Sequence, residues 1–222
     1  MLKLVKGCTL SAIAAVVISA PAFAAKPVET PGQNNNFTLA AKPAPVRFGL
    51  PTTLSGTLKD RANQTITLQH DPFPLDKAFV PIAQATTDVN GNYTFIGIQP
   101  FVNTIYRVVA TSPSANTESV LVMVAISVRL NVSDTSPEPG ETVTFAGTAK
   151  PAHDGADVQI QRRQPDGTYK TLRITKLEDD GLLRSKYKTG VKIARSGTYR
   201  VRVLADADHT NGIKSTSIRL DD

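Results

Sequence analysis

The stretch Ser196-Gly197-Thr198-Tyr199-Arg200-Val201-Arg202-Val203-Leu204-Ala205 decides the fold, and an earlier stretch, Asn103-Thr104-Ile105-Tyr106-Arg107-Val108-Val109-Ala110, repeats its pattern. In both, a tyrosine followed by an arginine heads a run that is rich in valine. Tyrosine and valine favour extended backbone, and alternation of apolar and polar residues indicates a strand with one buried face. We therefore expect each stretch to form a strand that packs against a core.

The rest of the chain shows that these two strands belong to an internal repeat. Leu54-Ser55-Gly56-Thr57 matches Phe145-Ala146-Gly147-Thr148 at an offset of 91 residues. Ile66-Thr67-Leu68-Gln69 matches Val158-Gln159-Ile160-Gln161 at an offset of 92, and Tyr106 and Tyr199 are 93 residues apart. Three matches at nearly constant spacing indicate two copies of one domain, and the 222 residues are enough for two domains of about 100 residues each.

Both copies consist of short strand-forming runs separated by turn residues, as at Gln164-Pro165-Asp166-Gly167-Thr168. Short strands with turns at intervals of about 8–12 residues are typical of a β-sandwich. The apolar run Val120–Ile126 is too short to span a bilayer, which takes about 20 residues. We interpret it as the last strand of the first domain leading directly into the second domain. Because no Gly/Ser-rich or Pro-rich linker interrupts it, the two domains are expected to sit in a fixed relation.

The stretch Gly197-Thr198-Tyr199-Arg200-Val201 resembles the immunoglobulin-like superfamily, in the bacterial secreted form without a disulfide. In that family a tyrosine stands two residues before the second bridging cysteine, and its hydroxyl caps a backbone corner. Tyr199 and Tyr106 take that place here, with valine in place of the cysteine. The stretch Thr87–Phe95 is also similar to the hairpins of transthyretin-like surface modules. The resemblance implies an all-β chain of two tandem immunoglobulin-like β-sandwich domains, over 46–126 and 127–222.

The first residues have the three-part pattern of a secretory signal peptide. Lys3 and Lys6 are basic, Leu10–Ile18 is almost wholly apolar, and Ala22-Phe23-Ala24 supplies the small residues of a cleavage site. The alternative is a retained membrane anchor, but the apolar stretch is short for that role and ends at Pro21. We expect a signal peptide over 1–24, a flexible Pro/Asn-rich tether over 25–45, and a location outside the cytoplasm, in the periplasm, at the cell surface or secreted.

Cysteine content and charge exclude several functions. Cys8 is the only cysteine and lies in the signal peptide, so the processed chain has no disulfide and no thiol nucleophile. Without Lys3 and Lys6 the chain has 23 basic and 19 acidic residues. From residue 42 to 125 there are 6 basic and 5 acidic residues, and from 126 to 222 there are 16 and 13. This mixture of signs argues against a nucleic-acid partner, while weak affinity for an anionic envelope stays open.

The stretch Asp88-Val89-Asn90-Gly91-Asn92 allows two interpretations. Asn-Gly is the preferred pair for tight hairpin turns, because both residues tolerate positive φ. A calcium loop is the alternative, since Asp88, Asn90 and Asn92 offer alternating oxygen ligands. The stretch lacks the spacing before glycine and the distal glutamate of the helix–loop–helix calcium site. The sequence therefore favours the turn.

The histidines are His70, His153 and His209, and we expect all three in loops. The densest cluster of metal-ligand types is Asp206-Ala207-Asp208-His209, but metal sites usually draw ligands from several segments. No Gly-x-Ser-x-Gly elbow or phosphate-binding glycine loop is present in the sequence. We therefore assign no catalytic, cofactor-binding or metal residue and no cofactor.

Two functions remain for a chain of this kind. The first is a non-enzymatic secreted or cell-surface binding or structural module that contacts a protein or the cell envelope, and a pure spacer is its limiting case. The alternative is a metal-dependent protein or hydrolase that uses the loops at His153 and Asp206–His209. Convergence of these two loops in space would favour the alternative.

Overall fold

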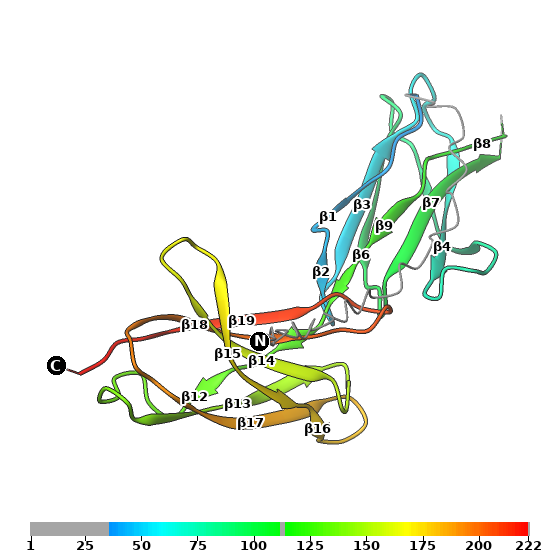
Figure 1. Cartoon of the computed structure of the whole chain (residues 1–222). Coiled ribbons are helices and arrows are strands. Elements are labelled where there is room, and N and C mark those ends of the chain that lie inside the picture. The colour runs from blue at the N-terminus through cyan, green and yellow to red at the C-terminus, as the bar shows by residue number, and fades with distance from the viewer. Residues whose placement is uncertain (1–35, 112–113, 222) are drawn as a thin grey trace, which may run out of the picture.

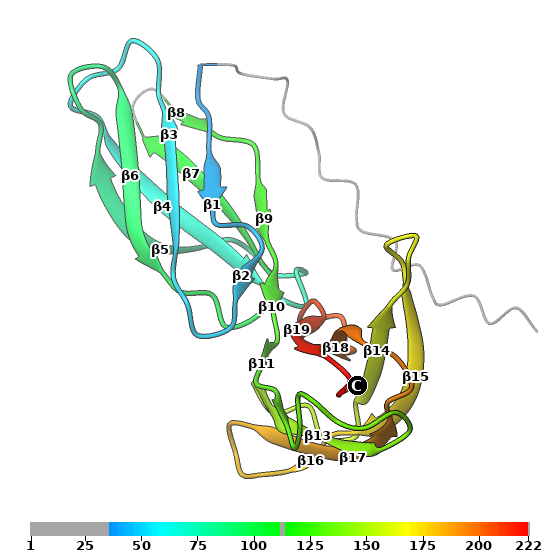
Figure 2. The same cartoon turned by 90° about the vertical axis from the view of Figure 1, so that its left-hand side faces the viewer.

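Figure 1 shows a computed structural model of the chain, which describes residues 36–111 and 114–221. All regular elements in these residues are β-strands, and they form two sandwiches joined end to end (Figures 1 and 2). The expected signal peptide and the first part of the expected tether lie outside the described residues. Among the described residues, no helix is long and apolar enough to cross a membrane.

The first sandwich is built from two antiparallel sheets. One has the strand order β1-β3-β6, and the other has the order β5-β4-β7-β8, with β9 also pairing with β7. A short parallel pair of β2 with β10 joins the start of this sandwich to its end. The strand bounds are Ala40–Lys42 (β1), Val46–Arg47 (β2), Thr52–Thr57 (β3), Thr65–Pro72 (β4), Val80–Thr86 (β5), Asn92–Ile98 (β6), Thr104–Thr111 (β7), Ser114–Asn116 (β8), Val120–Val122 (β9) and Val124–Ala125 (β10).

The second sandwich has the same plan. One sheet has the order β11-β13-β17-β16, with β12 also pairing with β13, and the other has the order β15-β14-β18-β19. The strand bounds are Ser127–Val128 (β11), Asn131–Val132 (β12), Thr142–Lys150 (β13), Asp157–Arg163 (β14), Tyr169–Lys176 (β15), Glu178–Asp179 (β16), Ser185–Lys192 (β17), Gly197–Val203 (β18) and Gly212–Ile218 (β19).

The sheet assignment of the strands defines the fold class. In the first copy β1, β3 and β6 form one sheet, and β4, β5, β7 and β8 form the facing sheet. In the second copy β11, β13 and β17 correspond to the first of these sheets, and β14, β15, β18 and β19 correspond to the second. This division is that of the immunoglobulin fold. The fold is therefore all-β, with two tandem immunoglobulin-like sandwiches, as the sequence predicts.

Alternation along the central strands builds a separate core in each sandwich. Tyr106 and Val108 of β7 are buried in the first core, and Tyr199 and Val201 of β18 are buried at the corresponding places in the second. Their neighbours in the chain are only half-buried, as period-2 alternation requires. One contiguous apolar cluster per sandwich is what two domains are expected to show.

The arginine that follows each of these tyrosines lies on the outer face of its sheet against an aromatic ring. The Arg107 guanidinium lies 4.0 Å from the centroid of the Phe79 ring and donates to Gln69 at 2.8 Å. The second sandwich repeats the arrangement with Arg200, Tyr169 and Gln161, at 3.5 Å and 2.7 Å. The repeated Tyr-Arg and the repeated glutamine thus have one structural cause, since each arginine is fixed by a cation–π contact and an amide oxygen.

The tyrosine corner implied by the family resemblance is present in the second sandwich. The Tyr199 hydroxyl donates to the Arg195 carbonyl at 2.7 Å, and burial raises the pKa of Tyr199. In the first sandwich the corresponding carbonyl, that of Val102, accepts from the Thr104 hydroxyl at 2.7 Å. The Tyr106 hydroxyl contacts Thr104, while burial raises the pKa of Tyr106 to about 12. The two copies therefore hold the same corner through different hydroxyls.

This difference predicts unequal effects of removing the two hydroxyls. Tyr199→Phe is expected to lower the free energy of unfolding of the second sandwich by about 1 kcal/mol, because it deletes the corner hydrogen bond. Tyr106→Phe is expected to cost less in the first sandwich, where Thr104 still holds the corner. Urea unfolding followed by circular dichroism measures both values. Equal losses in the two variants would contradict the asymmetry.

Each copy also has a glycine that lies against a carbonyl and a tyrosine hydroxyl. The Tyr187 hydroxyl donates to the Arg129 carbonyl at 2.7 Å. A Cβ atom at Gly147 would overlap that carbonyl and approach the hydroxyl to 2.6 Å. The repeated glycine is therefore required by close packing between neighbouring strands and not by a turn. The first sandwich repeats the arrangement with Gly56, Thr38 and Tyr93.

The stretch Asp88–Asn92 forms the expected turn. Gly91 has a φ of 81°, and its amide donates to the Asp88 carbonyl at 3.0 Å. The Asp88 carboxylate accepts from the backbone amides of Asn90 and Asn92, both at 2.8 Å, and from the Asn92 side chain. These bonds, above all that from the Asn92 amide, lower the pKa of Asp88. Its oxygens therefore serve to close the turn.

Two local predictions are corrected by the structure. Residues 37–42, expected in the flexible tether, belong to the first sandwich: β1 pairs with β3, and Phe37 is buried in the first core. A three-residue strand that is followed directly by Pro43 is too short to produce a visible alternation. Strand β4 continues through Pro72. His70 therefore lies in a strand, opposite Tyr106, and not in a loop.

Candidate functional site

The two sandwiches meet where the β18–β19 loop of the second runs beside the end of the first. Ala125 of β10 and Thr210 of the loop form a parallel β-bridge. The Thr210 amide donates to the Val124 carbonyl at 2.8 Å, and the Ile126 amide donates to the Thr210 carbonyl at 3.0 Å. The backbone of the loop is thus hydrogen-bonded along the segment that leads from one sandwich into the other.

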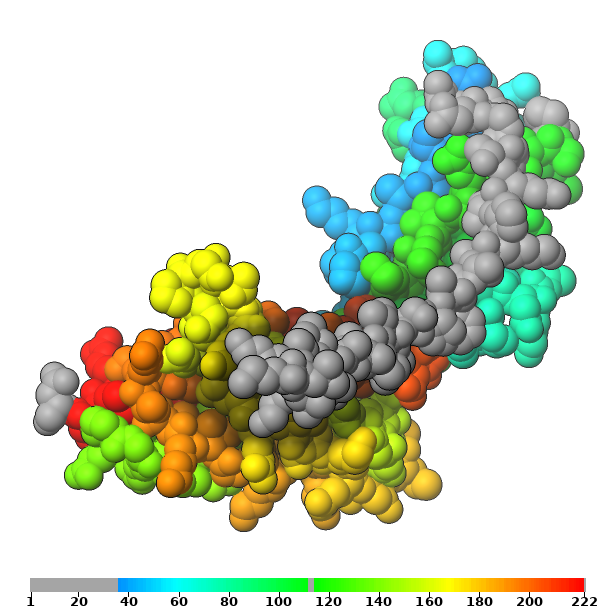
Figure 3. Space-filling model, in the orientation of Figure 1, coloured from blue at the N-terminus to red at the C-terminus, as the bar shows by residue number. Residues whose placement is uncertain are grey.

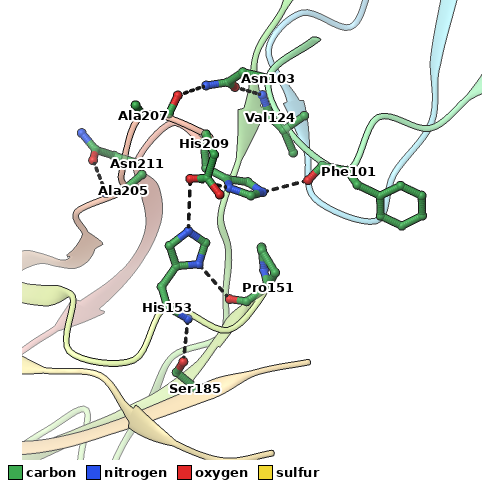
Figure 4. A network of polar contacts seen from close by, with 11 residues as sticks. Phe101, Asn103, Val124, Pro151, His153, Ser185, Ala205, Ala207, His209 and Asn211 are labelled. Carbon is green, nitrogen blue, oxygen red and sulfur yellow. Dashed lines mark hydrogen bonds and ion pairs between the residues drawn. The ribbon is translucent and has the colours of Figure 1, made fainter. Parts of the chain in front are cut away.

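Asn103, just before β7, makes three hydrogen bonds at the junction, two of them to this loop. Its side-chain amide donates to the Ala207 carbonyl at 3.0 Å, and its backbone amide donates to the Asp208 carbonyl at 2.7 Å. Its side-chain oxygen accepts from the amide of Val124, a fully buried residue, at 2.8 Å (Figure 4). One side chain therefore holds both the loop and the connecting strand.

His209 extends from the same loop into the junction. Its side chain is 2 % exposed, and its Nε2 lies 2.9 Å from the Phe101 carbonyl of the first sandwich. Its ring also packs against the ring of Phe48, with centroids 5.9 Å apart. Since a carbonyl only accepts, Nε2 carries the proton and donates it across the junction.

His153 approaches His209 from another loop of the second sandwich, between β13 and β14. The two imidazole rings meet edge to face, with centroids 4.9 Å apart. The His153 backbone amide donates to the Ser185 hydroxyl at 2.8 Å, and its ring Nδ1 lies 3.2 Å from the Pro151 carbonyl (Figure 4). The ring is 5 % exposed. These contacts orient the His153 ring so that its Nε2 atom points toward the junction.

Asp208 completes the cluster. Its Oδ1 atom lies 3.0 Å from Nδ1 of His209 and 3.7 Å from Nε2 of His153. The three side chains bring one ligand atom each to within 4.8 Å of one another, which is a spacing compatible with one metal ion. We refer to His153, Asp208 and His209 as the junction cluster.

The junction cluster joins residues that the sequence had placed in two separate candidate loops. His153 and the Asp206–His209 stretch converge, as the alternative hypothesis required. Asp206 is not one of the clustered ligands. Its backbone carbonyl accepts a hydrogen bond from the His209 amide at 3.4 Å. His70 lies in β4 of the first sandwich, outside the cluster.

Sequence reasoning missed the groups of the first sandwich that hold the junction, Asn103 and the Phe101 carbonyl. They lie just before the repeated tyrosine strand β7, and no composition or spacing signal distinguishes them. The only indirect signal is the missing linker after Val120–Ile126, which predicted a fixed relation between the domains.

Comparison with known proteins gives a likeness in structure only. No protein-family model and no curated protein matches the chain. A tetra-tandem repeat from the extending region of a large adhesion protein is 19 % identical, with 82 % of this chain and 49 % of that chain covered and a TM-score of 0.34. Red sea bream transglutaminase is 11 % identical, with coverages of 84 % and 31 % and a TM-score of 0.44. The polymeric Ig receptor ectodomain of a teleost fish is 12 % identical, with coverages of 83 % and 97 % and a TM-score of 0.38.

The chain thus spans about half the length of the adhesion-protein repeat structure. The strand order and sheet pairing of the chain itself define its class, which is a tandem immunoglobulin-like β-sandwich protein. Because this fold carries many unrelated functions, the function has to be argued from surfaces and sites.

Proposed function

We propose that the chain is a non-enzymatic binding module of the bacterial secreted immunoglobulin-like kind, exported by its signal peptide and acting at the cell surface, in the periplasm or as a secreted protein. Its two domains, 37–126 and 127–222 with the first boundary moved to include β1, contact a protein or a polymer of the cell envelope. Export and the domain limits rest on the sequence pattern. The binding role is supported by one surface of the second sandwich.

That surface is a row of lysines on the outer face of β17. Lys186, Lys188 and Lys192 alternate with inward residues, so all three point away from the core. The facing positions of β13, Thr148 and Ala146, are uncharged, so the row is not neutralised from that strand. Lys186 also lies 4.0 Å from Asp180 at the end of the row. We refer to these three residues as the lysine row.

The position of the lysine row suits contact with an extended anionic polymer. Strand β17 lies along the side of the second sandwich that faces away from the first (Figures 1 and 2), where gold and orange atoms form the lower surface in Figure 3. The junction therefore leaves this face open while it keeps the first sandwich at a distance. Glu178 of β16 is the register partner of Lys186, so acidic residues lie only at that end of the lysine row. Each lysine near an anionic surface adds about 1 kcal/mol of attraction at low salt.

The convergence of the two loops supports the metal-dependent alternative, but the burial of the junction cluster argues against a hydrolase. A catalytic metal site keeps an open position for its substrate. Here both imidazoles are almost fully buried, and their outer nitrogens are each held by a backbone carbonyl. The geometry supports a structural role for these residues more than a chemical one.

The binding role predicts a salt-sensitive interaction with isolated cell envelopes. The purified chain is expected to co-sediment with envelopes at low salt and to be released as salt rises. Replacing Lys186, Lys188 and Lys192 together by glutamine is expected to weaken that binding by about 100-fold, since about 1 kcal/mol is lost for each charge. Sedimentation across a salt series measures both effects.

A matched control removes the same charge from loops of the first sandwich. Lys59, Arg61 and Lys77 are exposed, and their joint replacement by glutamine is expected to change envelope binding little. Equal losses in the two triple variants would contradict the lysine row as the contact. Absence of wild-type binding at low salt would exclude the envelope polymer as the partner.

A further inference from the structure

The junction cluster presents three electron-pair donors to one point. A carbonyl oxygen can only accept, so Nδ1 of His153 must donate to Pro151 and Nε2 of His209 must donate to Phe101. In the neutral rings the remaining nitrogens, Nε2 of His153 and Nδ1 of His209, carry lone pairs. Both lone pairs face Oδ1 of Asp208. Two acceptor nitrogens and a carboxylate oxygen repel one another unless a proton or a metal cation lies among them, and a metal cation satisfies all three at once.

Burial makes this arrangement costly without such a cation. Oδ1 of Asp208 and Nδ1 of His209 are buried and have no hydrogen-bond partner among the described residues. The His209 side chain is 2 % exposed, and it points into the cluster. A buried polar atom without a partner destabilises the fold. The same two atoms become satisfied at once when they bind a shared ion.

The outer contacts of both histidines are those of metal ligands. A histidine that binds a metal usually donates its other ring N–H to a carbonyl or carboxylate, which fixes the tautomer and the ring direction. His153 and His209 both do so, with ring nitrogens 3.2 Å and 2.9 Å from backbone carbonyls. The cluster thus has inner ligands and outer supports already in position.

We propose that His153, Asp208 and His209 bind one divalent transition-metal ion of the zinc class, through Nε2, Oδ1 and Nδ1 respectively. Two imidazole nitrogens and one carboxylate oxygen suit zinc, whereas calcium prefers six to eight oxygen ligands. Water or the second Asp208 oxygen supplies the fourth position. The ion binds Nδ1 of His209, while Nε2 of the same ring donates to the Phe101 carbonyl of the first sandwich. Metal binding therefore stiffens the junction between the sandwiches. This inference is independent of the envelope-binding role.

Titration calorimetry on the purified chain, freed of metal by a chelator, tests the proposal. Zinc is expected to bind one ion per chain, and calcium is expected to give no heat. Asp208→Asn and His153→Gln are each expected to weaken zinc binding by about 100-fold or more, since each removes a ligand. His70→Gln removes a histidine outside the cluster and is expected to bind zinc like the wild type.

Nitrogen-detected NMR of the wild-type chain gives a second test that needs no variant to fold. Zinc is expected to shift Nε2 of His153 and Nδ1 of His209, while the opposite nitrogens keep their protons. A flat zinc titration, zinc binding that survives both substitutions, or shifts at the opposite nitrogens would each overturn the metal site. Circular dichroism confirms that each variant used in the titrations has kept its strands.

Discussion

Replacing Gly147 by alanine is expected to destabilise the second sandwich by about 3 kcal/mol. The new Cβ would overlap the Arg129 carbonyl and approach the Tyr187 hydroxyl, and that hydroxyl donates a part-buried hydrogen bond to the same carbonyl. The methyl group therefore forces two neighbouring strands apart and weakens that bond at the same time. Urea unfolding followed by circular dichroism measures the loss.

The neighbouring Thr148→Ala variant is the control, because it removes side-chain volume from a half-buried position of the same strand. Its effect is expected to stay below about 1 kcal/mol. Because the first sandwich has the same arrangement, Gly56→Ala is expected to destabilise it to a similar extent through Thr38 and Tyr93. A Gly147→Ala variant as stable as the wild type would show that the close strand packing is wrong.

Replacing Asn103 by alanine is expected to loosen the junction while both sandwiches stay folded. The variant loses the hydrogen bond to Ala207 and leaves the buried Val124 amide without its acceptor. Together these losses cost about 3 kcal/mol, shared between the contact to the second sandwich and the connecting strand β10. Nitrogen-15 relaxation measures the effect, since the two sandwiches of the variant should tumble with different correlation times.

Asn211→Ala is the matched control for the junction. Asn211 lies in the same loop and accepts from the Ala205 amide at 2.9 Å, so its bond stays within the second sandwich. This variant is expected to keep a common correlation time for the two sandwiches. The role given to Asn103 would be contradicted if both variants tumbled like the wild type.

Most of the fold could be predicted from the sequence because its signals are local. Strand alternation, the turn glycines and the repeated tyrosines each act within a few residues, and the strands at Tyr106 and Tyr199 and the turn at Gly91 are found where they were expected. The constant offset between the copies extended these signals to the whole chain. The short strand β1 was missed because its order comes from pairing with β3 and from Phe37, both of which depend on the folded sandwich.

The junction cluster shows where sequence reasoning stops. Asp208 and His209 are adjacent, but His153 lies more than fifty residues earlier, and no ligand spacing connects them. The loops meet because β13 and β14 on one side and β18 and β19 on the other end at the same point of the sandwich. Likewise, the glycines of the repeat could be recognised as a pattern, while the carbonyl and the hydroxyl that require them come from distant strands.

The central claim is that the Asn103 and His209 contacts hold the two sandwiches in one fixed orientation. Residual dipolar couplings of the backbone amides, measured in a weakly aligned sample of the wild-type chain, test it most directly. The structure predicts that one alignment tensor fits residues 37–125 and 127–221 together in the orientation seen in Figure 1. Two tensors of different magnitude would contradict the claim, because they would show that the sandwiches move independently.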